Sequence, residues 1–583
     1  MKDSVFTFTI AVLFITLTIM FYGVFYGWLD DTILANYLQG VFLGEPISEF
    51  FTAHIFISKI YHFFYQNFVL IGWYGVFLII FNGLAVFNVF YVIYKKWQSL
   101  HKSNFYIIFL TCLIVYILIL VENLVLLNYS KTALLLLGSS LLLLDFFAYS
   151  NFRSKIHFIW YVYLMMSILI GLFLRYDIAI FIIIPLTFFL VRNFNNKFYL
   201  IKVITFSIVV GFLFFLTMNL SLVSDVKEKN KVISHILNIT DGKNTINDFF
   251  IDLANKDIEY KALALSYLPD TKFYNSESLD IWGQRSILSI ESLKFFYSKL
   301  VFELNKANSS YSSDYLESEN WLQPFVFFLL FNFAIFIFSI IYSKNKHHLF
   351  FHVLILSSYY LGIVIVMVFF KMEGRVAMPS SAIITLASFS LFVENNSGIV
   401  YRLRKYLFIF LVVISIFKLQ SLSKLSEKKQ NELVLQSNFV KELNHVFNNK
   451  LIFFDIWTMS LFSNDPLLVT PRNTSNKYLT HKECWSGFID NHVKYIDNLC
   501  GGSDFVSFYS CMYNKKNQVV FVYTKDARIG LIEEYAKRIH NYNLEFSEIF
   551  ANSELSKIKY AYLPNKLDFG YFIITKFENC KEN

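Results

Sequence analysis

Seven ionisable side chains stand where long apolar stretches of the sequence begin or end, and their types suit acid–base chemistry and phosphate binding. They are Asp30, Asp31, Glu122, Arg175, Asp177, Glu373 and Arg375. A carboxylate can take a proton from an acceptor hydroxyl or hold a divalent cation, and an arginine can neutralise the phosphate of a leaving group. Ionisable groups in or beside membrane spans are costly to bury and are usually functional. These residues are therefore our candidate site.

Each group also has a simpler structural interpretation. Asp31 precedes the segment 32–38 and could cap a short amphipathic helix. Arg175 and Arg375 could be anchors whose charged ends reach the membrane surface. Glu122 could pair with one of these arginines. Both interpretations stay open at the level of the sequence.

The composition places these residues in a membrane protein. The 583 residues are 56% hydrophobic, 19% aromatic and 16% charged, with a mean hydropathy of +0.49. Soluble domains carry about 25% charged residues. The formal net charge of +8 comes without a basic stripe outside short loops, which argues against a nucleic-acid partner.

Apolar runs predict the elements that position the candidate site. A transmembrane helix needs about 20 mostly apolar residues. Eleven such runs lie at 5–26, 67–94, 104–127, 132–149, 157–174, 178–191, 199–218, 323–342, 349–370, 379–393 and 407–420. We therefore predict an α-helical polytopic membrane protein with about 11 transmembrane helices. The runs at 178–191 and 379–393 are short and could be partly re-entrant segments.

Positive charge predicts the orientation of these helices, because Lys and Arg in short loops are retained on the cytoplasmic side. Every second loop is basic. The residues concerned are Lys95, Lys96, Lys102, Arg153, Lys155, Arg192, Lys197, Lys344, Lys346, Arg402, Arg404 and Lys405. The N-terminus is then inside, and the candidate side chains meet at the outer face. The first run lacks a small-residue cleavage site and is expected to be a retained span.

Two domains are expected from this topology. Residues 1–420 form a transmembrane domain that includes an outer loop at 27–66 and a large outer loop at 219–322. Residues 421–583 form a C-terminal extracytoplasmic α/β domain, in which strand-like runs at 450–456, 518–523 and 570–576 bracket a helix-like run at 531–540.

Four of the five cysteines fall in this expected extracytoplasmic domain: Cys484, Cys500, Cys511 and Cys580. An oxidising compartment permits disulfides. We expect at least one disulfide among them, for example between Cys484 and Cys500, and four free thiols are the alternative.

Four short motifs resemble GT-C membrane glycosyltransferases. The first is Gly27-Trp28-Leu29-Asp30-Asp31, which is followed by a turn at Gly44-Glu45-Pro46. The others are the stretch 128–134 (NYSKTAL), the stretch 171–177 (GLFLRYD), and Gly374-Arg375 with Pro379. Together they cover the membrane part, about residues 1–420. The oligosaccharyltransferase WWD signature is not present, and the loop at 219–322 resembles nothing that we can name.

The resemblance implies a chemistry for the candidate residues. Asp30 or Asp31 would be the catalytic acid, either as a base or as a ligand of a divalent cation such as Mg²⁺ or Mn²⁺. Adjacent residues of a helix diverge by about 100°, so one of the two should face the cleft. We favour Asp31, with Asp30 orienting the loop, although the converse assignment is open. Arg175 and Arg375 would contact the donor phosphate. Supporting cleft residues would be Glu122, Asp177 and Glu373.

The expected function is transfer of a sugar from a polyprenyl-phosphate donor to a glycan, lipid or protein acceptor, with inversion at the anomeric carbon. It would take place at the outer face of a bacterial inner membrane, in contact with membrane lipid. One alternative is an O-antigen polymerase or ligase, which would rely on outer-loop arginines or a histidine. A transporter or a non-enzymatic membrane protein is another, but transport favours charges at mid-membrane depth and broken helices.

Overall fold

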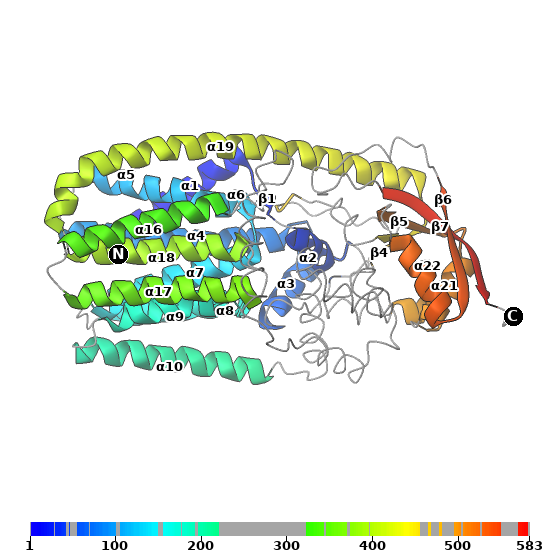
Figure 1. Ribbon diagram of the computed structural model, residues 1–583, viewed down its shortest axis with the longest axis horizontal. Coiled ribbons are helices and arrows are strands. Elements are labelled where there is room, and N and C mark those ends of the chain that lie inside the picture. The colour runs from blue at the N-terminus through cyan, green and yellow to red at the C-terminus, as the bar shows by residue number, and fades with distance from the viewer. Residues whose placement is uncertain are drawn as a thin grey trace.

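The computed structural model describes residues 2–27, 29–41, 46, 55–68, 70–100, 105–149, 155–176, 178–192, 196–220, 322–342, 346–369, 374–395, 397–454, 465–467, 477–480, 495–502, 505–524, 528–549 and 569–580. Most of these residues are helical, and a small sheet lies near the C-terminus (Figure 1). The helices form an elongated bundle, with the sheet beyond one of its ends.

The helices of the bundle follow one another along the chain. They are α1 (Lys2–Tyr22), α2 (Leu29–Gln39), α3 (Ile55–Asn67), α4 (Trp73–Leu100), α5 (Phe105–Val115), the π-helical segment η1 (Tyr116–Leu120), α6 (Val121–Val125), α7 (Tyr129–Tyr149), α8 (Lys155–Leu174), α9 (Ile180–Val191), α10 (Lys197–Leu220), α16 (Leu322–Tyr342), α17 (Lys346–Phe369), α18 (Gly374–Asn395) and α19 (Ser397–Val446). Each apolar run of the sequence lies largely in one of them, except the run at 104–127, which is divided among α5, η1 and α6.

Among the described residues, five helices are long and apolar enough to cross a membrane. They are Asp3–Tyr22, Trp73–Lys96, Ile108–Val125, Tyr129–Ala148 and Lys197–Thr217. Shorter apolar helices cover Phe158–Leu174, Ile180–Val191, Phe328–Ile341, Leu349–Ile363 and Val376–Leu391. The chain is thus a helical membrane protein, whereas the number of about 11 spans stays a prediction.

Helix α7 is central in the bundle and contacts α4, α8, α9, α10 and α18. Buried polar side chains join it to its neighbours: Asn82 Nδ2 donates to Thr132 Oγ1 (2.8 Å), and Asn88 Nδ2 donates to Ser140 Oγ (3.1 Å). Helix α10 instead exposes apolar side chains such as Phe198 and Ile208. This contrast is expected where one helix is surrounded by protein and the other faces lipid tails.

A short parallel pairing places α2 beside the start of α7. Strand β1 (Phe25–Tyr26) pairs with β2 (Leu126–Leu127), and the Gly27 N–H donates to the Leu127 carbonyl (2.7 Å). The chain that leaves α1 therefore lies against the chain that enters α7. Consequently the first turn of α2, which contains Asp31, reaches the first turn of α7.

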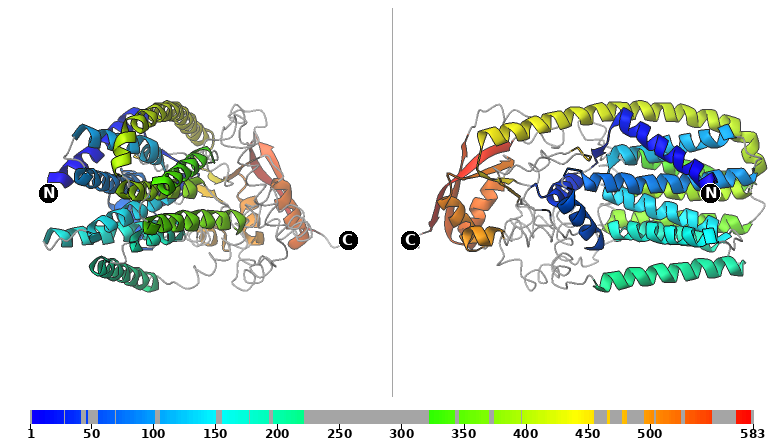
Figure 2. Two further views of the ribbon diagram at one scale, coloured as in Figure 1. Left: turned by 60° about the vertical axis from the view of Figure 1, so that its left-hand side comes forward. Right: turned by 180° about the vertical axis from the view of Figure 1, so that it is seen from behind.

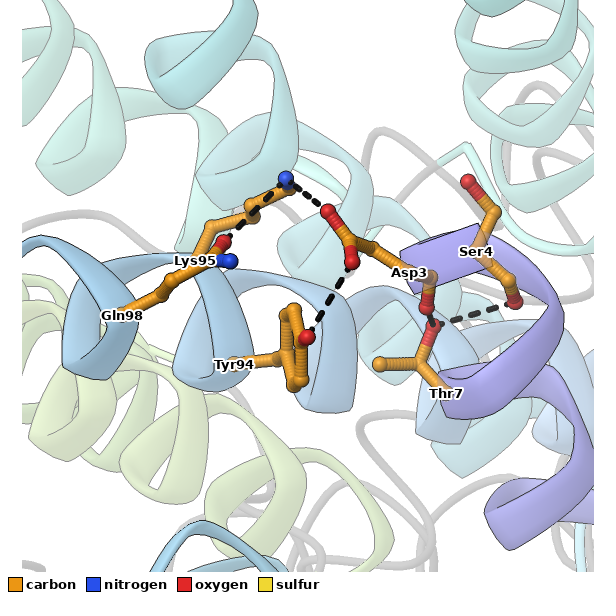
Figure 3. Close-up of polar contacts among 6 residues, drawn as sticks. All are labelled: Asp3, Ser4, Thr7, Tyr94, Lys95 and Gln98. Carbon is orange, nitrogen blue, oxygen red and sulfur yellow. Dashed lines mark hydrogen bonds and ion pairs between the residues drawn. The ribbon is translucent and has the colours of Figure 1, made fainter. Parts of the chain in front are cut away.

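Polar contacts also join helices at the opposite end of the bundle, where α1 begins and α4 ends. Asp3 accepts hydrogen bonds from Lys95 Nζ and from the Tyr94 hydroxyl (3.1 Å), as Figure 3 shows. Within α1 the Thr7 hydroxyl donates to the Asp3 carbonyl (2.9 Å). These contacts hold the start of α1 against α4.

Helix α19 connects the bundle to the C-terminal sheet. It runs along the bundle, where it contacts α1, α5 and α18, and continues to the sheet (Figures 1 and 2). The expected domain boundary at 420/421 falls within this continuous helix. At its far end the ring of Phe447 packs on Tyr571 of the sheet, with centroids 5.3 Å apart.

The sheet has the strand order β4-β3-β5-β7-β6. The strands are β3 (Leu451–Phe454), β4 (Lys477–Thr480), β5 (Val519–Thr524), β6 (Tyr542–Ile549) and β7 (Phe569–Asn579). Strands β4, β3 and β5 are parallel to one another. Strand β7 is antiparallel to both of its neighbours, β5 and β6. Helices α21 (Phe505–Asn514) and α22 (Arg528–Ile539) belong to the same region. The strands expected at 518–523 and 570–576 and the helix expected at 531–540 are confirmed within a few residues, and β3 confirms the described part of the strand expected at 450–456.

Alternating apolar residues give the sheet two buried faces. In β5, Val520 and Val522 belong to a hydrophobic core shared with the end of α19, whereas Phe521 and Tyr523 belong to a second core shared with α21 and α22. This alternation is the period of two that a strand requires. Both faces are therefore covered by helices.

One disulfide is present in this region, between Cys500 and Cys511. It differs from the Cys484–Cys500 example that the sequence suggested. Cys580 is a free thiol, and Cys484 lies outside the described residues. The helix that ends at Cys500 and helix α21 bring the two bonded sulfurs together, a proximity that sequence spacing alone does not reveal.

Candidate functional site

Asp31 lies at the centre of the candidate site and is completely buried. Its Oδ1 accepts hydrogen bonds from the Tyr74 hydroxyl (2.8 Å) and from the Tyr129 backbone N–H (3.1 Å). Its Oδ2 accepts one from Asn128 Nδ2 (2.6 Å). Because Tyr129 begins α7, the carboxylate sits at a helix N-terminus, where the helix dipole favours an anion.

Asp31 is not the N-cap of the segment 32–38 that the sequence offered as an alternative. Asp31 lies inside α2, and its carboxylate bonds to α4 and α7 instead. Asn128 caps α7 in the usual way, because its Oδ1 accepts the Lys131 N–H (3.0 Å). The acid thus adds a second anchor to an already capped helix start.

Buried tyrosines surround this acid on the side of α3 and α4. The rings of Tyr61 and Tyr26 pack against Tyr74, with centroids 5.5 Å and 5.7 Å away. The Tyr65 hydroxyl accepts the Tyr74 backbone N–H (2.8 Å). Burial raises the pKa of the Tyr61 and Tyr65 phenols well above the ordinary value, so both stay neutral donors and acceptors at physiological pH.

Arg175 reaches the same helix start from the end of α8. Its Nη1 donates to the hydroxyls of Tyr129 (2.6 Å) and Ser130 (2.8 Å), and its guanidinium lies over the Tyr129 ring, 5.2 Å from the centroid. Tyr129 therefore touches the candidate acid through its backbone and the candidate arginine through its side chain. Arg175 as a whole is only partly buried.

Glu122 lies in α6, directly after the π-helical segment, and forms an ion pair with Lys418 of α19. The sequence left open a pair of Glu122 with Arg175 or Arg375; its described ion-pair partner is Lys418, and the Arg375 side chain lies outside the described residues. The π-helical segment is fixed by Tyr116, whose hydroxyl bonds Thr18 Oγ1 (2.6 Å) and donates to the Phe14 carbonyl (3.1 Å). Such segments occur often at functional sites because they rotate the residues that follow.

Lys131 links the two acids. It is buried in the first turn of α7 and interacts electrostatically with both Glu122 and Asp31. The start of α7 thus gathers two carboxylates and the cations Lys131, Lys418 and Arg175, which come from four helices and from the residue that follows α8.

Other candidate residues fall outside this description. Asp177 and Glu373 lie outside the described residues. Asp30 and Arg375 belong to α2 and α18, but their side chains lie outside the described part of the structure.

A divalent cation at Asp31 stays a prediction, because the side chain of Asp30, its expected co-ligand, lies outside the described part of the structure. The described hydrogen-bond donors to the Asp31 carboxylate are Tyr74, Asn128 and Tyr129. Within the described ranges, no group of three or more His, Cys, Asp or Glu side chains could hold a metal. We assign no step to a metal.

Three residues of the site were missed from the sequence. Lys131 and Lys418 stand inside or beside apolar runs, and a charge in such a run was the signal that could have identified them. Tyr74 carries no such signal, because its residue type is common in this chain.

Comparison with known proteins adds no identity to this arrangement. No family model matches the chain, and no curated protein sequence matches it.

Proposed function

We propose that this protein is a GT-C-like membrane glycosyltransferase that moves a sugar from a polyprenyl-phosphate donor to an acceptor hydroxyl. One observation carries the proposal: α2, which carries Asp30 and Asp31, and Arg175, which follows α8, are both held at the start of α7 by hydrogen bonds to Tyr129. A base and a phosphate ligand at one end of an apolar bundle are what a lipid-linked donor requires, because its phosphate lies at the membrane surface.

Arg175 would stabilise the leaving phosphate in this reaction. The hydroxyls of Tyr129 and Ser130 orient its guanidinium, and its partial exposure allows a phosphate to approach. As the bond between the anomeric carbon and the phosphate oxygen breaks, the electron pair passes to that oxygen. A fixed arginine offsets the growing negative charge, and partial dehydration at the interface strengthens the contact.

We further propose that Asp31 and Asp30 have different tasks, which revises the assignment favoured by the sequence. Asp31 accepts three hydrogen bonds and is completely buried, so it orients α2 on α7. Asp30, which diverges from it by about 100° on the same helix, would take the proton of the acceptor hydroxyl. The hydroxyl oxygen then bonds the anomeric carbon with inversion.

The Cys500–Cys511 disulfide supports an extracytoplasmic location for the sheet region, because disulfides persist in oxidising compartments. Helices α2 and α3 lie at the end of the bundle nearest the sheet (Figure 1). The site at the start of α7 would then face the outer side, consistent with a bacterial inner-membrane enzyme with about 11 spans.

The test is transfer of radiolabelled sugar from a panel of polyprenyl-phosphate monosaccharides in membranes that contain the protein. Asp30→Asn should reduce turnover by about 100-fold to 10,000-fold. Arg175→Ala should raise the KM for the donor. Asp3→Asn, at the opposite end of the bundle, is the matched control and should transfer at the parental rate.

Failure of Asp30→Asn to slow transfer would remove Asp30 as the base. Absence of transfer with every donor would exclude the glycosyltransferase assignment under these conditions. Chain extension of a lipid-linked glycan by the same membranes would favour a polymerase or ligase, and substrate uptake without transfer would favour a transporter.

A further inference from the structure

A turn from the C-terminal region lies against the start of α4, close to the candidate site. The Leu467 carbonyl accepts the Gly72 backbone N–H (3.1 Å). Pro466 is buried, and the Leu467 side chain packs on the hydrophobic core of the bundle. The turn is closed by its own first residue, since the Leu467 N–H donates to Asp465 Oδ1 (2.8 Å).

Two glycines of the bundle make this contact possible. A Cβ added at Gly72 would lie 3.1 Å from the carbonyl carbon of Pro466 and in conflict with its oxygen. A Cβ added at Gly75 would lie only 2.7 Å from the same carbon and from the Pro466 Cβ. Since real Cβ atoms do not approach so closely, only glycine lets the backbone of the turn come so near.

The contact leads directly to Asp31. Tyr74 lies between the two glycines in the sequence, and its hydroxyl donates to Asp31. Asp465 is also near enough to act electrostatically on the phenol of Tyr26, whose ring packs on Tyr74. A displacement of the turn would therefore shift the first turn of α4 and, with it, the donor that orients the acid.

We propose that the turn Asp465–Leu467 is a positioning element of the candidate site. By resting on Gly72 and Gly75 it holds the first turn of α4 where Tyr74 bonds Asp31. In this way a segment of the C-terminal region would help to position a residue pair of the membrane domain. The structural coupling stands on these contacts alone, whereas its effect on catalysis rests on the proposed function.

The test compares variants on both sides of the contact in the full-length protein. Gly75→Ala changes the bundle side, and Pro466→Gly changes the turn without altering any membrane helix. Gly211→Ala in α10 and Gly530→Ala in α22 are matched controls, because an added Cβ meets no heavy atom within 4 Å at either position. Size-exclusion chromatography selects the variants that remain folded.

Hydrogen–deuterium exchange is the first measurement. Gly75→Ala and Pro466→Gly should both lose protection in peptides that cover 70–80 and 126–134, and the two controls should retain it. Unchanged exchange at 126–134 in the folded Pro466→Gly variant would overturn the coupling, whatever the enzyme does.

Transfer kinetics are the second measurement. A displaced Asp31 would shift α2, which carries the proposed base Asp30, and should lower kcat by about 10-fold to 100-fold while the donor KM stays unchanged. A rise in donor KM without loss of kcat would overturn the positioning role and indicate a donor-binding contact. If the parental protein transfers no sugar, the proposed function fails, and the exchange experiment still decides the coupling.

Discussion

The two ends of α7 each hold a buried carboxylate, but they hold it differently. At the far end, the Asp145 carboxylate accepts hydrogen bonds from both Nη atoms of Arg192 (2.8 Å and 3.0 Å) and from the Tyr199 hydroxyl (2.8 Å). At the near end, the Asp31 carboxylate accepts hydrogen bonds from the Tyr74 phenol, the Asn128 side-chain amide and the Tyr129 backbone N–H. The first arrangement is a bidentate ion pair, and the second is a carboxylate oriented by neutral donors at a helix N-terminus.

This difference fits the different roles that we propose for the two ends. The bidentate ion pair neutralises the charge of Asp145 and fixes two helices to each other, α7 and the end of α9. The described hydrogen bonds to Asp31 come from neutral donors, and the buried Lys131 interacts with its charge. Arg175 bonds hydroxyls close by, and Lys418 pairs with Glu122. We therefore propose the near end as the place of the chemistry.

The largest effect is expected from breaking the ion pair at the far end. Arg192→Ala leaves Asp145 buried without its guanidinium and should lower the free energy of unfolding by about 3–5 kcal/mol. Arg192→Lys keeps the charge but loses the bidentate geometry, so an intermediate loss is expected. Thermal unfolding in detergent measures both. An alanine variant as stable as the parental protein would mean that the pair is not structural.

A smaller loss is expected when Asp31 loses its charge. Asp31→Asn keeps the shape, but one amide must now face donors from Tyr74, Asn128 and Tyr129, so we expect a loss of about 1–3 kcal/mol. Asp3→Asn, at the partly exposed pair with Lys95, should cost about 0–1 kcal/mol. The same unfolding measurement applies. Equal losses for the two variants would contradict the role of Asp31 as an anchor of α7.

Two matched tyrosines sharpen the comparison further. Tyr74→Phe removes the phenol that bonds Asp31, and Tyr163→Phe removes the phenol that donates to Asn88 Oδ1 (2.7 Å). Each should cost about 0.5–1.5 kcal/mol of stability, because each variant loses the hydrogen bonding of a buried or partly buried phenol. Only Tyr74→Phe should also lower kcat for sugar transfer. A matching loss of kcat in Tyr163→Phe would show that transfer follows stability alone.

The smallest effect concerns Glu533, a carboxylate in the sheet region whose Oε1 accepts the Phe546 N–H (2.9 Å). Partial burial, with a contribution from Glu545, raises the pKa of this carboxyl above its ordinary value. The folded protein therefore binds a proton more readily than the unfolded chain. Its contribution to stability is fully present below the unfolded pKa and is lost as pH rises through the folded pKa.

Glu533→Gln should remove that dependence. Exchange protection of the Phe546 amide, corrected for intrinsic rates, should fall between acidic and neutral pH in the parental protein and stay level in the variant. A parallel decline in both proteins would assign the pH dependence to other groups.

The sequence by itself determined the elements. Apolar runs become helices because a bilayer leaves no water to bond the backbone, and alternating residues become the strands of the sheet. It also picked out Asp31, Glu122 and Arg175 by their positions at run ends, and these three lie near the start of α7. The sequence also contains Gly72 and Gly75, but it does not show that the backbone of Pro466 lies against them.

Only the tertiary structure decided the partners. The bond of Asp31 to Tyr129, the pairing of Glu122 with Lys418 and the Cys500–Cys511 disulfide each join residues from different elements. The contact of Pro466 with Gly72 and Gly75 does the same over most of the chain. Such partners depend on how helices rotate and pack against one another, and residue type and spacing constrain only the face and depth of each side chain. The pairing of particular side chains is therefore set by the packing of the helices and the sheet.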